Sequence, residues 1–98
     1  MYLKIHEQQG KKIIAVCDKE LIGKILTDGN AYLDLDKYRG FYVGKLSSEN
    51  EVKKSLKSFS SANVVGKNAV NMVLNVGLAD KKDVMYINKI PYIQIYSV

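Results

Sequence analysis

Residues 61–80 carry the clearest hydrophobic pattern in the chain, and it has the spacing of an α-helix. Apolar residues recur at helical intervals, at Val65, Ala69, Met72, Val73 and Val76. The polar residues that collect on the opposite side are Lys67, Asn68, Asn71 and Asn75. Asn63 is placed to cap the N-terminus, and Gly77 is placed to close the C-terminus in a Schellman turn with Leu78. The pattern predicts one helix of about three to four turns with one buried face.

Both ends of the chain alternate apolar and polar residues with the period of a β-strand. Near the N-terminus, residues 2–7 and 11–17 flank Gln8-Gln9-Gly10 and predict a hairpin, with Gly10 in the turn. Near the C-terminus, residues 84–87 and 90–98 flank Asn88-Lys89 and predict a second hairpin. Pro91 cannot donate a ladder hydrogen bond, so the last strand is expected to lie at an edge there.

The middle of the chain mixes both patterns. Asp18 is expected to cap a short helix whose buried face is Leu21, Ile22, Ile25 and Leu26. Turn residues 27–30 follow, and residues 31–36 alternate as a half-buried strand. Residues 37–44, rich in aromatic side chains between glycines, fit either a short strand or an aromatic loop.

A second helix is predicted from the capping box of Ser48 and Glu51. Its buried side is Val52, Leu56 and Phe59, and residues 60–62 separate it from the helix that Asn63 is expected to cap, so the two helices are expected to pair. The element order ββαβ(β)ααββ predicts an α+β fold, a single compact domain over residues 1–98, with a mainly antiparallel sheet, two terminal hairpins and three helices.

Five stretches together resemble one protein family. They are residues 1–5, 17–24, 62–70, 75–78 and 90–95, which read Met-Tyr-Leu-Lys-Ile, Cys-Asp-Lys-Glu-Leu-Ile-Gly-Lys, Ala-Asn-Val-Val-Gly-Lys-Asn-Ala-Val, Asn-Val-Gly-Leu and Ile-Pro-Tyr-Ile-Gln-Ile. In these stretches the chain is similar to the small archaeal domain-of-unknown-function family 424. The resemblance implies a cytoplasmic, archaeal, α+β protein, and it brings no established activity, cofactor or catalytic residue.

Composition excludes several classes of protein. An apolar fraction of 47% in 98 residues is typical of a globular domain rather than a disordered chain. No stretch approaches the roughly 18 apolar residues of a membrane span, and the first residues show no signal-peptide pattern, which predicts a cytoplasmic protein. The single cysteine, Cys17, excludes an internal disulfide and a multi-cysteine zinc site.

The net charge of +5 favours an anionic partner such as RNA through the release of counterions. Fourteen lysines but only one arginine, Arg39, carry this charge, and arginine is the usual residue for bidentate phosphate and guanine contacts. A lysine surplus is also typical of a solvated surface without a nucleic-acid partner.

Three patterns in the sequence have features of a chemical site. Cys17 at a predicted helix start has the position of an activated thiol, with His6 as the single available base, but an apolar strand end favours a structural cysteine. Asp34 and Asp36 share a strand side without a third metal ligand, which favours an exposed strand face. Residues 66–68 in the first turn of the central helix fit an anion site or a close helix contact at Gly66. We therefore expect no catalytic residue, no bound metal and no cofactor.

Tyrosines and lysines give the remaining candidate surface. Tyr2, Tyr92 and Tyr96 share strand sides with Lys4 and Gln94, and aromatic side chains among basic ones can stack unpaired bases. The residues expected to contact nucleic acid are Lys4, Lys53, Lys54, Lys57, Lys67, Tyr92 and Tyr96. The expected function is a small binding protein associated with RNA or a ribonucleoprotein, for example in translation. The alternative is a protein-interaction subunit or homo-oligomer that uses the edge of the C-terminal strand, with no nucleic acid and no membrane.

Overall fold

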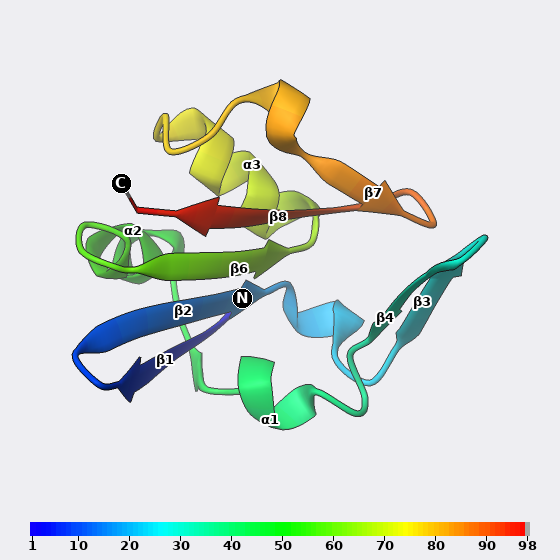
Figure 1. Ribbon diagram of the computed structural model, residues 1–98, viewed down its shortest axis with the longest axis horizontal. Coiled ribbons are helices and arrows are strands. Elements are labelled where there is room, and N and C mark those ends of the chain that lie inside the picture. The colour runs from blue at the N-terminus through cyan, green and yellow to red at the C-terminus, as the bar shows by residue number, and fades with distance from the viewer. Residues whose placement is uncertain (98) are drawn as a thin grey trace.

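A six-stranded sheet organises the structure, a computed structural model that describes residues 1–97 (Figure 1). Its spatial order is β5-β1-β2-β6-β8-β7. The strands are β1 (Tyr2–Gln8), β2 (Lys11–Cys17), β5 (Lys45–Leu46), β6 (Ser61–Val65), β7 (Met85–Ile87) and β8 (Ile90–Tyr96). The pair β2–β6 is parallel and the other neighbours are antiparallel. The predicted α+β class with a mainly antiparallel sheet is therefore confirmed.

Two helices, α2 (Glu49–Ser55) and α3 (Lys67–Asn75), cover one face of this sheet. The strand side chains beneath them are Leu3, Ile14, Val16, Ala62, Val64 and Ile93. Val52 and Leu56 of the α2 segment and Met72 and Val73 of α3 complete this core. The register places Leu3, Val16, Val64 and Ile93 in one row across four strands. Because alternate residues of a strand face opposite ways, one set of positions is buried under the helices.

Both terminal hairpins are confirmed, and they use the same kind of turn. Gln9 and Gly10 have positive φ in the first turn, and Asn88 and Lys89 have positive φ in the second. Two successive residues in this region form the type I′ turn that matches the right-handed twist of paired strands. Pro91, however, is not at an edge, because β6 and β7 lie on either side of it. The missing N–H of Pro91 is tolerated because the facing carbonyl, that of Gly66, accepts from Val70 in α3.

The predicted helix of residues 61–80 is correct only in its second half. Residues 61–65 form β6, which lies between β2 and β8 and buries Ala62 and Val64. The helix then begins after Gly66, and Asn63 does not cap it. The C-terminal prediction is confirmed, since Gly77 has a φ of 79° and Leu78 N–H donates to the Val73 carbonyl at 3.2 Å. The helical pair predicted for residues 48–80 is therefore two helices separated by a strand.

Asp18 caps α3 and not a helix of its own. Its two carboxylate oxygens accept hydrogen bonds from the backbone N–H groups of Asn68 and Ala69, each at 2.9 Å. Asp18 follows β2 and Gly66 follows β6, so the parallel pairing of these two strands brings the cap to the helix. The carboxylate meets the unpaired N–H groups and the positive end of the α3 dipole.

The helix predicted from Asp18 to Leu26 is wrong. A single 3₁₀ turn, η1 (Lys19–Leu21), is followed by a hairpin of β3 (Ile25–Asp28) and β4 (Ala31–Asp34). Gly23 has a φ of 92°, which would break a helix at this point. Residues 37–44, undecided from the sequence, contain the one-turn helix α1 (Arg39–Tyr42). The predicted strand of residues 31–36 ends at Asp34.

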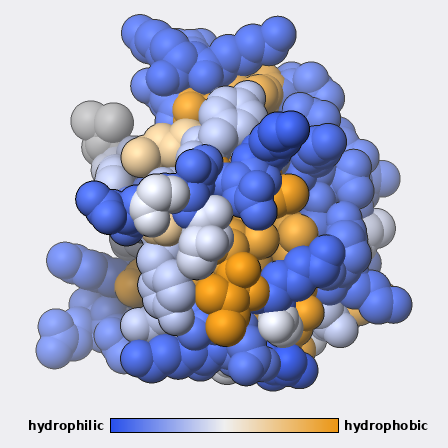
Figure 2. Space-filling model, turned by 90° about the vertical axis from the view of Figure 1, so that its right-hand side faces the viewer, coloured by the Kyte–Doolittle hydropathy of each residue, from blue (hydrophilic) through white to orange (hydrophobic). Residues whose placement is uncertain are grey.

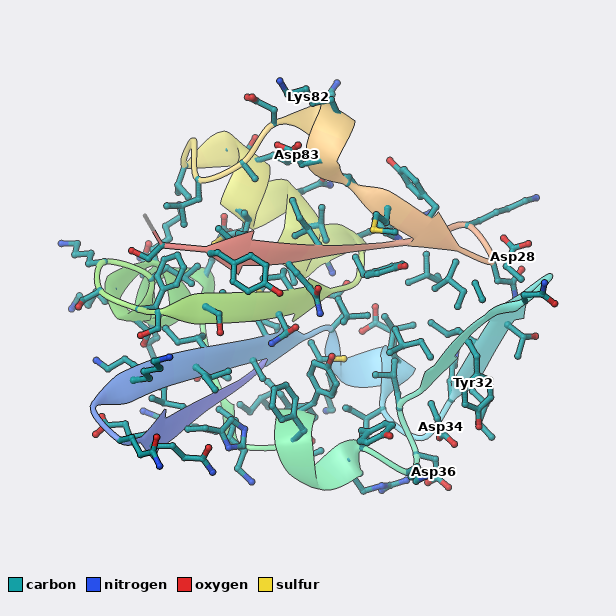
Figure 3. The ribbon with its side chains drawn as sticks, viewed as in Figure 1. Asp28, Tyr32, Asp34, Asp36, Lys82 and Asp83 are labelled. Carbon is teal, nitrogen blue, oxygen red and sulfur yellow. The ribbon has the colours of Figure 1, made fainter. Side chains whose placement is uncertain are left out.

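A second core joins these middle elements to the other sheet face. Leu21, Leu26, Leu35 and Tyr42 pack on Ala15, Cys17, Val65 and Ile87. The β3–β4 hairpin also reaches the β7–β8 turn, where Asn88 N–H donates to the Asp28 carboxylate at 3.1 Å (Figure 3). Figure 2 shows apolar side chains gathered in the middle of this end of the molecule. One end of the second sheet face is therefore covered, and the other end is not.

The capping box at Ser48 is confirmed. Glu51 N–H donates to Ser48 Oγ, and the Glu51 carboxylate accepts from Ser48 N–H. The predicted pair of Glu49 and Lys53 is also present, at 3.6 Å. No helix within residues 1–97 is long and apolar enough to span a membrane.

Candidate nucleic-acid interface

The sheet face opposite α2 and α3 presents polar and aromatic side chains in rows, and we call it the outer face. The strand register aligns Lys4, Ala15, Asn63 and Gln94 in one row and His6, Ile13, Ser61 and Tyr96 in the next. A third row at the covered end holds Tyr2, Cys17, Val65 and Tyr92. The outer-face positions of β1, β2, β6 and β8 include no aspartate or glutamate. A polyanion can therefore approach this face without meeting a carboxylate.

The α1 segment covers the β1 side of the outer face. Lys4 Nζ donates to the Gly40 carbonyl at 2.6 Å, and His6 Nε2 lies 3.0 Å from the Phe41 carbonyl. The rings of His6 and Phe41 stack with their centroids 4.6 Å apart. The part of the outer face left open is thus formed by β2, β6 and β8.

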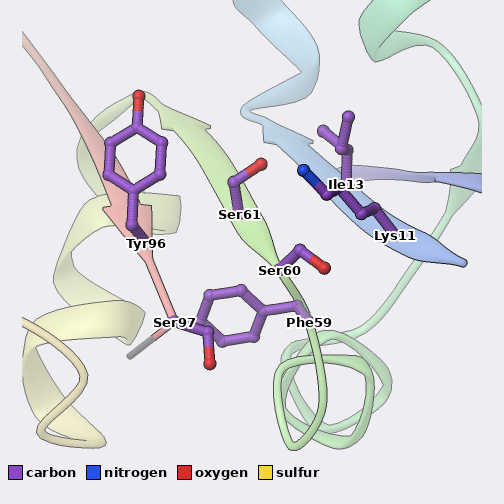
Figure 4. Close-up of a pocket in the computed structure, with 7 residues that line it drawn as sticks. All are labelled: Lys11, Ile13, Phe59, Ser60, Ser61, Tyr96 and Ser97. Carbon is purple, nitrogen blue, oxygen red and sulfur yellow. The ribbon is translucent and has the colours of Figure 1, made fainter. Parts of the chain in front are cut away.

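A hollow of about 560 Å³ lies at the open end of these strands (Figure 4). Its lining residues are Lys11, Ile13, Phe59, Ser60, Ser61, Tyr96 and Ser97. Lys11 and Ile13 stand on β2, Tyr96 stands on β8, and Ser60 and Ser61 lie between them (Figure 4). The hollow combines one ammonium group, two aromatic rings and serine hydroxyls at the surface. These groups can stack on a base, hydrogen-bond its edge and neutralise a phosphate.

The two tyrosines predicted on this face differ in exposure. Tyr96 is 69% exposed, whereas Tyr92 is half-buried against the second core. Between them, Gln94 Nε2 donates to Asn63 Oδ1 at 3.0 Å, which orients both amides on the surface. Tyr96 is therefore the ring available for stacking, and the amide pair is available for hydrogen bonds to bases.

The seven residues predicted to contact nucleic acid do not form one surface. Lys4, Tyr92 and Tyr96 lie on the outer face, and Lys4 is held by the Gly40 carbonyl. Lys53 and Lys54 lie on α2, and Lys57 follows it in the helix layer on the opposite side of the sheet. Lys67 is the first residue of α3. The structure thus brings Tyr96 together with Lys11 rather than with the α2 lysines.

Sequence reasoning missed Lys11, Ser61 and Asn63 as outer-face residues. From the sequence, Ser61 is expected in the break between two helices and Asn63 at a helix cap, so their alignment with Ile13, Tyr96 and Gln94 is not visible there. The alternation of Ala62 and Val64 with polar neighbours is the signal that could have identified β6.

Cys17 and His6 do not form a catalytic pair. Cys17 is fully buried and its Sγ donates to the Asp18 carbonyl at 3.4 Å. Burial, followed by the nearby carboxylate of Asp18, raises the pKa of the thiol to about 12. Cys17 lies opposite Tyr2, so His6 is four residues away along β1, about 13 Å. The thiol is therefore neutral at physiological pH and lacks a neighbouring base.

Asp34 and Asp36 have structural partners rather than a shared cation site (Figure 3). Asp34 accepts hydrogen bonds from the backbone N–H groups of Asp36 and Lys37 and from the Tyr32 hydroxyl. The Lys37 N–H is the largest cause of the lowered pKa of Asp34. Asp36 pairs with Arg39 at 2.9 Å. Within residues 1–97 no group of three or more His, Cys, Asp or Glu residues is placed to hold a metal ion.

The anion site considered at residues 66–68 is filled by the protein itself. The N–H groups of Asn68 and Ala69 are both occupied by the Asp18 carboxylate. Burial raises the pKa of Asp18, and the two N–H donors oppose that rise. The close helix contact predicted as the alternative at Gly66 is wrong, because the group that comes close to Gly66 is the carboxylate of Asp18 and not another helix.

Comparisons with known proteins found a family model and a solved structure that are similar to nearly the whole chain. A family model described as "Protein of unknown function (DUF424)" matches residues 6–98. The crystal structure of an uncharacterized conserved protein from Methanopyrus kandleri is similar, with a TM-score of 0.75 and 24% identity, over 97% of this chain and 89% of that chain. No protein among the curated ones matches the chain significantly. These similarities support the fold described above.

Proposed function

We propose that this chain, which belongs to the DUF424 family of proteins of unknown function as its sequence resemblance indicates, is a non-enzymatic module. It binds single-stranded RNA at its outer face. The observation that carries the proposal is the exposed ring of Tyr96 beside a hollow that also contains Lys11, on a face without carboxylates. We propose that it acts in the cytoplasm, alone or in a ribonucleoprotein, where a lone thiol such as Cys17 stays reduced.

Sheet faces of this kind suit unpaired bases. A base that stacks on an aromatic side chain gains about 1–3 kcal/mol whatever its identity, and the neighbouring serine and amide groups offer hydrogen bonds to its edge. The net charge of +5 draws a polyanion to the surface, and this contribution falls as salt concentration rises. The proposal therefore requires binding that depends on both the Tyr96 ring and ionic strength.

We predict that Tyr96→Ala weakens binding of a single-stranded RNA oligonucleotide about 30-fold, which corresponds to the loss of roughly 2 kcal/mol of stacking. Lys11→Ala is expected to weaken binding less and to flatten its salt dependence, because it removes one cation. Fluorescence anisotropy at several salt concentrations measures both effects.

Tyr86→Ala is the matched control for the RNA experiment. Tyr86 is 64% exposed on β7, but the register places it on the helix side of the sheet, opposite Pro91. Its replacement should leave RNA affinity unchanged. Equal losses in Tyr86→Ala and Tyr96→Ala, or no RNA binding by the native protein at low salt, would exclude the outer face as the RNA site.

A second candidate function, self-association through the edge of β8, rests on a separate observation. β7 pairs only with residues 90–92, and Gln94 and Tyr96 continue beyond it with exposed side chains. Because residues 93 and 95 bond to β6, the backbone groups of Gln94 and Tyr96 point away from β6, and within residues 1–97 no strand pairs with them there. Such an edge can pair with the same edge of a second copy around a twofold axis.

We predict a concentration-dependent dimer in light scattering that Gln94→Pro abolishes. Proline at this position removes the outward N–H and leaves the β6–β8 bonds of residues 93 and 95 in place. Circular dichroism of the variant checks that the fold persists. A protein that stays monomeric at high concentration would rule out this second candidate.

A further inference from the structure

A groove on the helix side of the sheet has the composition of a small-molecule site. It lies between α3, the 3₁₀ turn η2 (Lys81–Asp83), β7 and the start of β8, and its volume is about 330 Å³. This volume is at the lower end of the ~300–1,000 Å³ range of ligand pockets in proteins. The groove is separated from the outer face by the sheet, because Tyr86 and Pro91 face α3 whereas Tyr92 faces the second core.

Three lysines from three different elements line this groove. Lys67 begins α3, Lys81 belongs to η2, and Lys89 lies in the β7–β8 turn. No aspartate or glutamate is among the lining residues, and in the described chain none of these lysines makes an ion pair. The carboxylate of Asp83, the last residue of η2, accepts a hydrogen bond from the backbone N–H of Asp80. An anion placed in the groove would be attracted by these unpaired ammonium groups.

The floor of the groove is apolar. It is formed by Val70 and Leu74 of α3, by Val84, and by Pro91 of β8. Tyr86 stands at its side with an exposed ring, and Asn71 adds an amide. An inorganic anion would use the lysines but would leave the ring and the apolar floor without a partner. The lining therefore fits a ligand that carries both a phosphate-like anion and a flat apolar group.

We propose that this groove binds a mononucleotide. Its phosphate lies among Lys67, Lys81 and Lys89, and its base packs against the Tyr86 ring over the apolar floor. The volume of the groove matches a single nucleotide rather than a longer segment of nucleic acid. The site is independent of RNA binding at the outer face, because the two surfaces share no residue.

Calorimetric titration of the full chain with adenosine monophosphate at low ionic strength tests the proposal. The double variant Lys67→Glu, Lys81→Glu should weaken binding at least ~10-fold, since it replaces two charge-assisted contacts by repulsion. Glutamate in the first turn of a helix is favourable, so this variant is expected to fold. The double variant Lys54→Glu, Lys57→Glu is the matched control, with the same change in charge in the α2 segment, and it should bind like the native protein.

Further variants and probes test the base and separate the two surfaces. Tyr86→Ala should weaken binding of adenosine monophosphate, while Tyr96→Ala should not. Adenosine alone and inorganic phosphate should each bind far more weakly than the nucleotide. The proposal is overturned if titration up to about 10 mM nucleotide gives no heat of binding. It is also overturned if the Lys67→Glu, Lys81→Glu variant binds the nucleotide with unchanged affinity. It is equally overturned if inorganic phosphate binds as tightly as the nucleotide. It is also overturned if Tyr96→Ala abolishes nucleotide binding and Tyr86→Ala does not.

Discussion

Replacing Asp18 by alanine is expected to lower the free energy of unfolding by about 3 kcal/mol, the second largest effect predicted for this chain. The carboxylate is buried and accepts from two N–H groups at the start of α3. Alanine leaves both donors without a protein partner, and the Ala69 N–H is buried, so each costs roughly 1–3 kcal/mol. The loss is moderated because the ionised carboxylate already bears a desolvation cost, which is why burial raises its pKa. Urea denaturation followed by circular dichroism measures the change.

Asp36→Ala provides the matched control for Asp18→Ala. Asp36 is also an aspartate with a hydrogen-bonded partner, Arg39 at 2.9 Å, but both side chains are more than half exposed. Exposed pairs of this kind contribute about 0–1 kcal/mol. Asp18→Asn retains one acceptor oxygen and should lie between the two alanine variants. Equal losses for Asp18→Ala and Asp36→Ala would contradict the assignment of Asp18 as the cap of α3.

Features set by neighbouring residues were predictable from the sequence. The two hairpins, the capping box of Ser48 and the Schellman turn at Gly77 each depend on a few adjacent residues whose chemistry is visible in the sequence. The strand β6 was missed because its apolar residues, including Val65, extend the helical pattern that follows it. These residues form a strand because they pair with β2 and β8, which are distant in the sequence.

The same long-range contacts explain the error at residues 18–26. Leu21, Ile22, Ile25 and Leu26 have helical spacing, yet Gly23 takes a positive φ and the chain turns back as a hairpin. Asp18, read as a local cap, serves a helix that begins about 50 residues later. A cap supplied from another strand leaves no sequence pattern, because the pairing that brings it there is parallel and non-local.

The candidate surface was predicted only in part, because it too depends on contacts between distant parts of the sequence. Alternation within the last strand correctly placed Tyr92, Gln94 and Tyr96 on one side. The residues that complete the hollow, Lys11 and Ser61, belong to other strands, and only the register of β2, β6 and β8 brings them together. Strand faces could thus be predicted one at a time, while their assembly into a surface could not.

The largest effect is expected for Gly66→Ala, which should cost about 4 kcal/mol. Gly66 has φ 111° and ψ 157°, a conformation that is essentially restricted to glycine and costs other residues about 1–3 kcal/mol. An added Cβ would also overlap the carboxylate of Asp18, which is buried and cannot move away without releasing α3. Native stability of small domains is about 5–15 kcal/mol, so a loss of this size would remove between about a quarter and most of it. Thermal and urea denaturation measure the loss.

Gly77→Ala separates strain at Gly66 from the general cost of replacing a glycine with positive φ. Gly77 has a φ of 79°, but a Cβ added there meets no atom within 4 Å, so its replacement should cost only about 1–2 kcal/mol. In the double variant Asp18→Ala, Gly66→Ala the overlap with the carboxyl group disappears, and only the overlap with the Cβ of residue 18 remains. The combined loss should therefore be smaller than the sum by about 1–2 kcal/mol. Strict additivity would show that Gly66 is required for its backbone conformation alone. Coupling of the expected size would show that β2, β6 and α3 are held together at one point, where the carboxylate of Asp18 occupies the space that a glycine leaves.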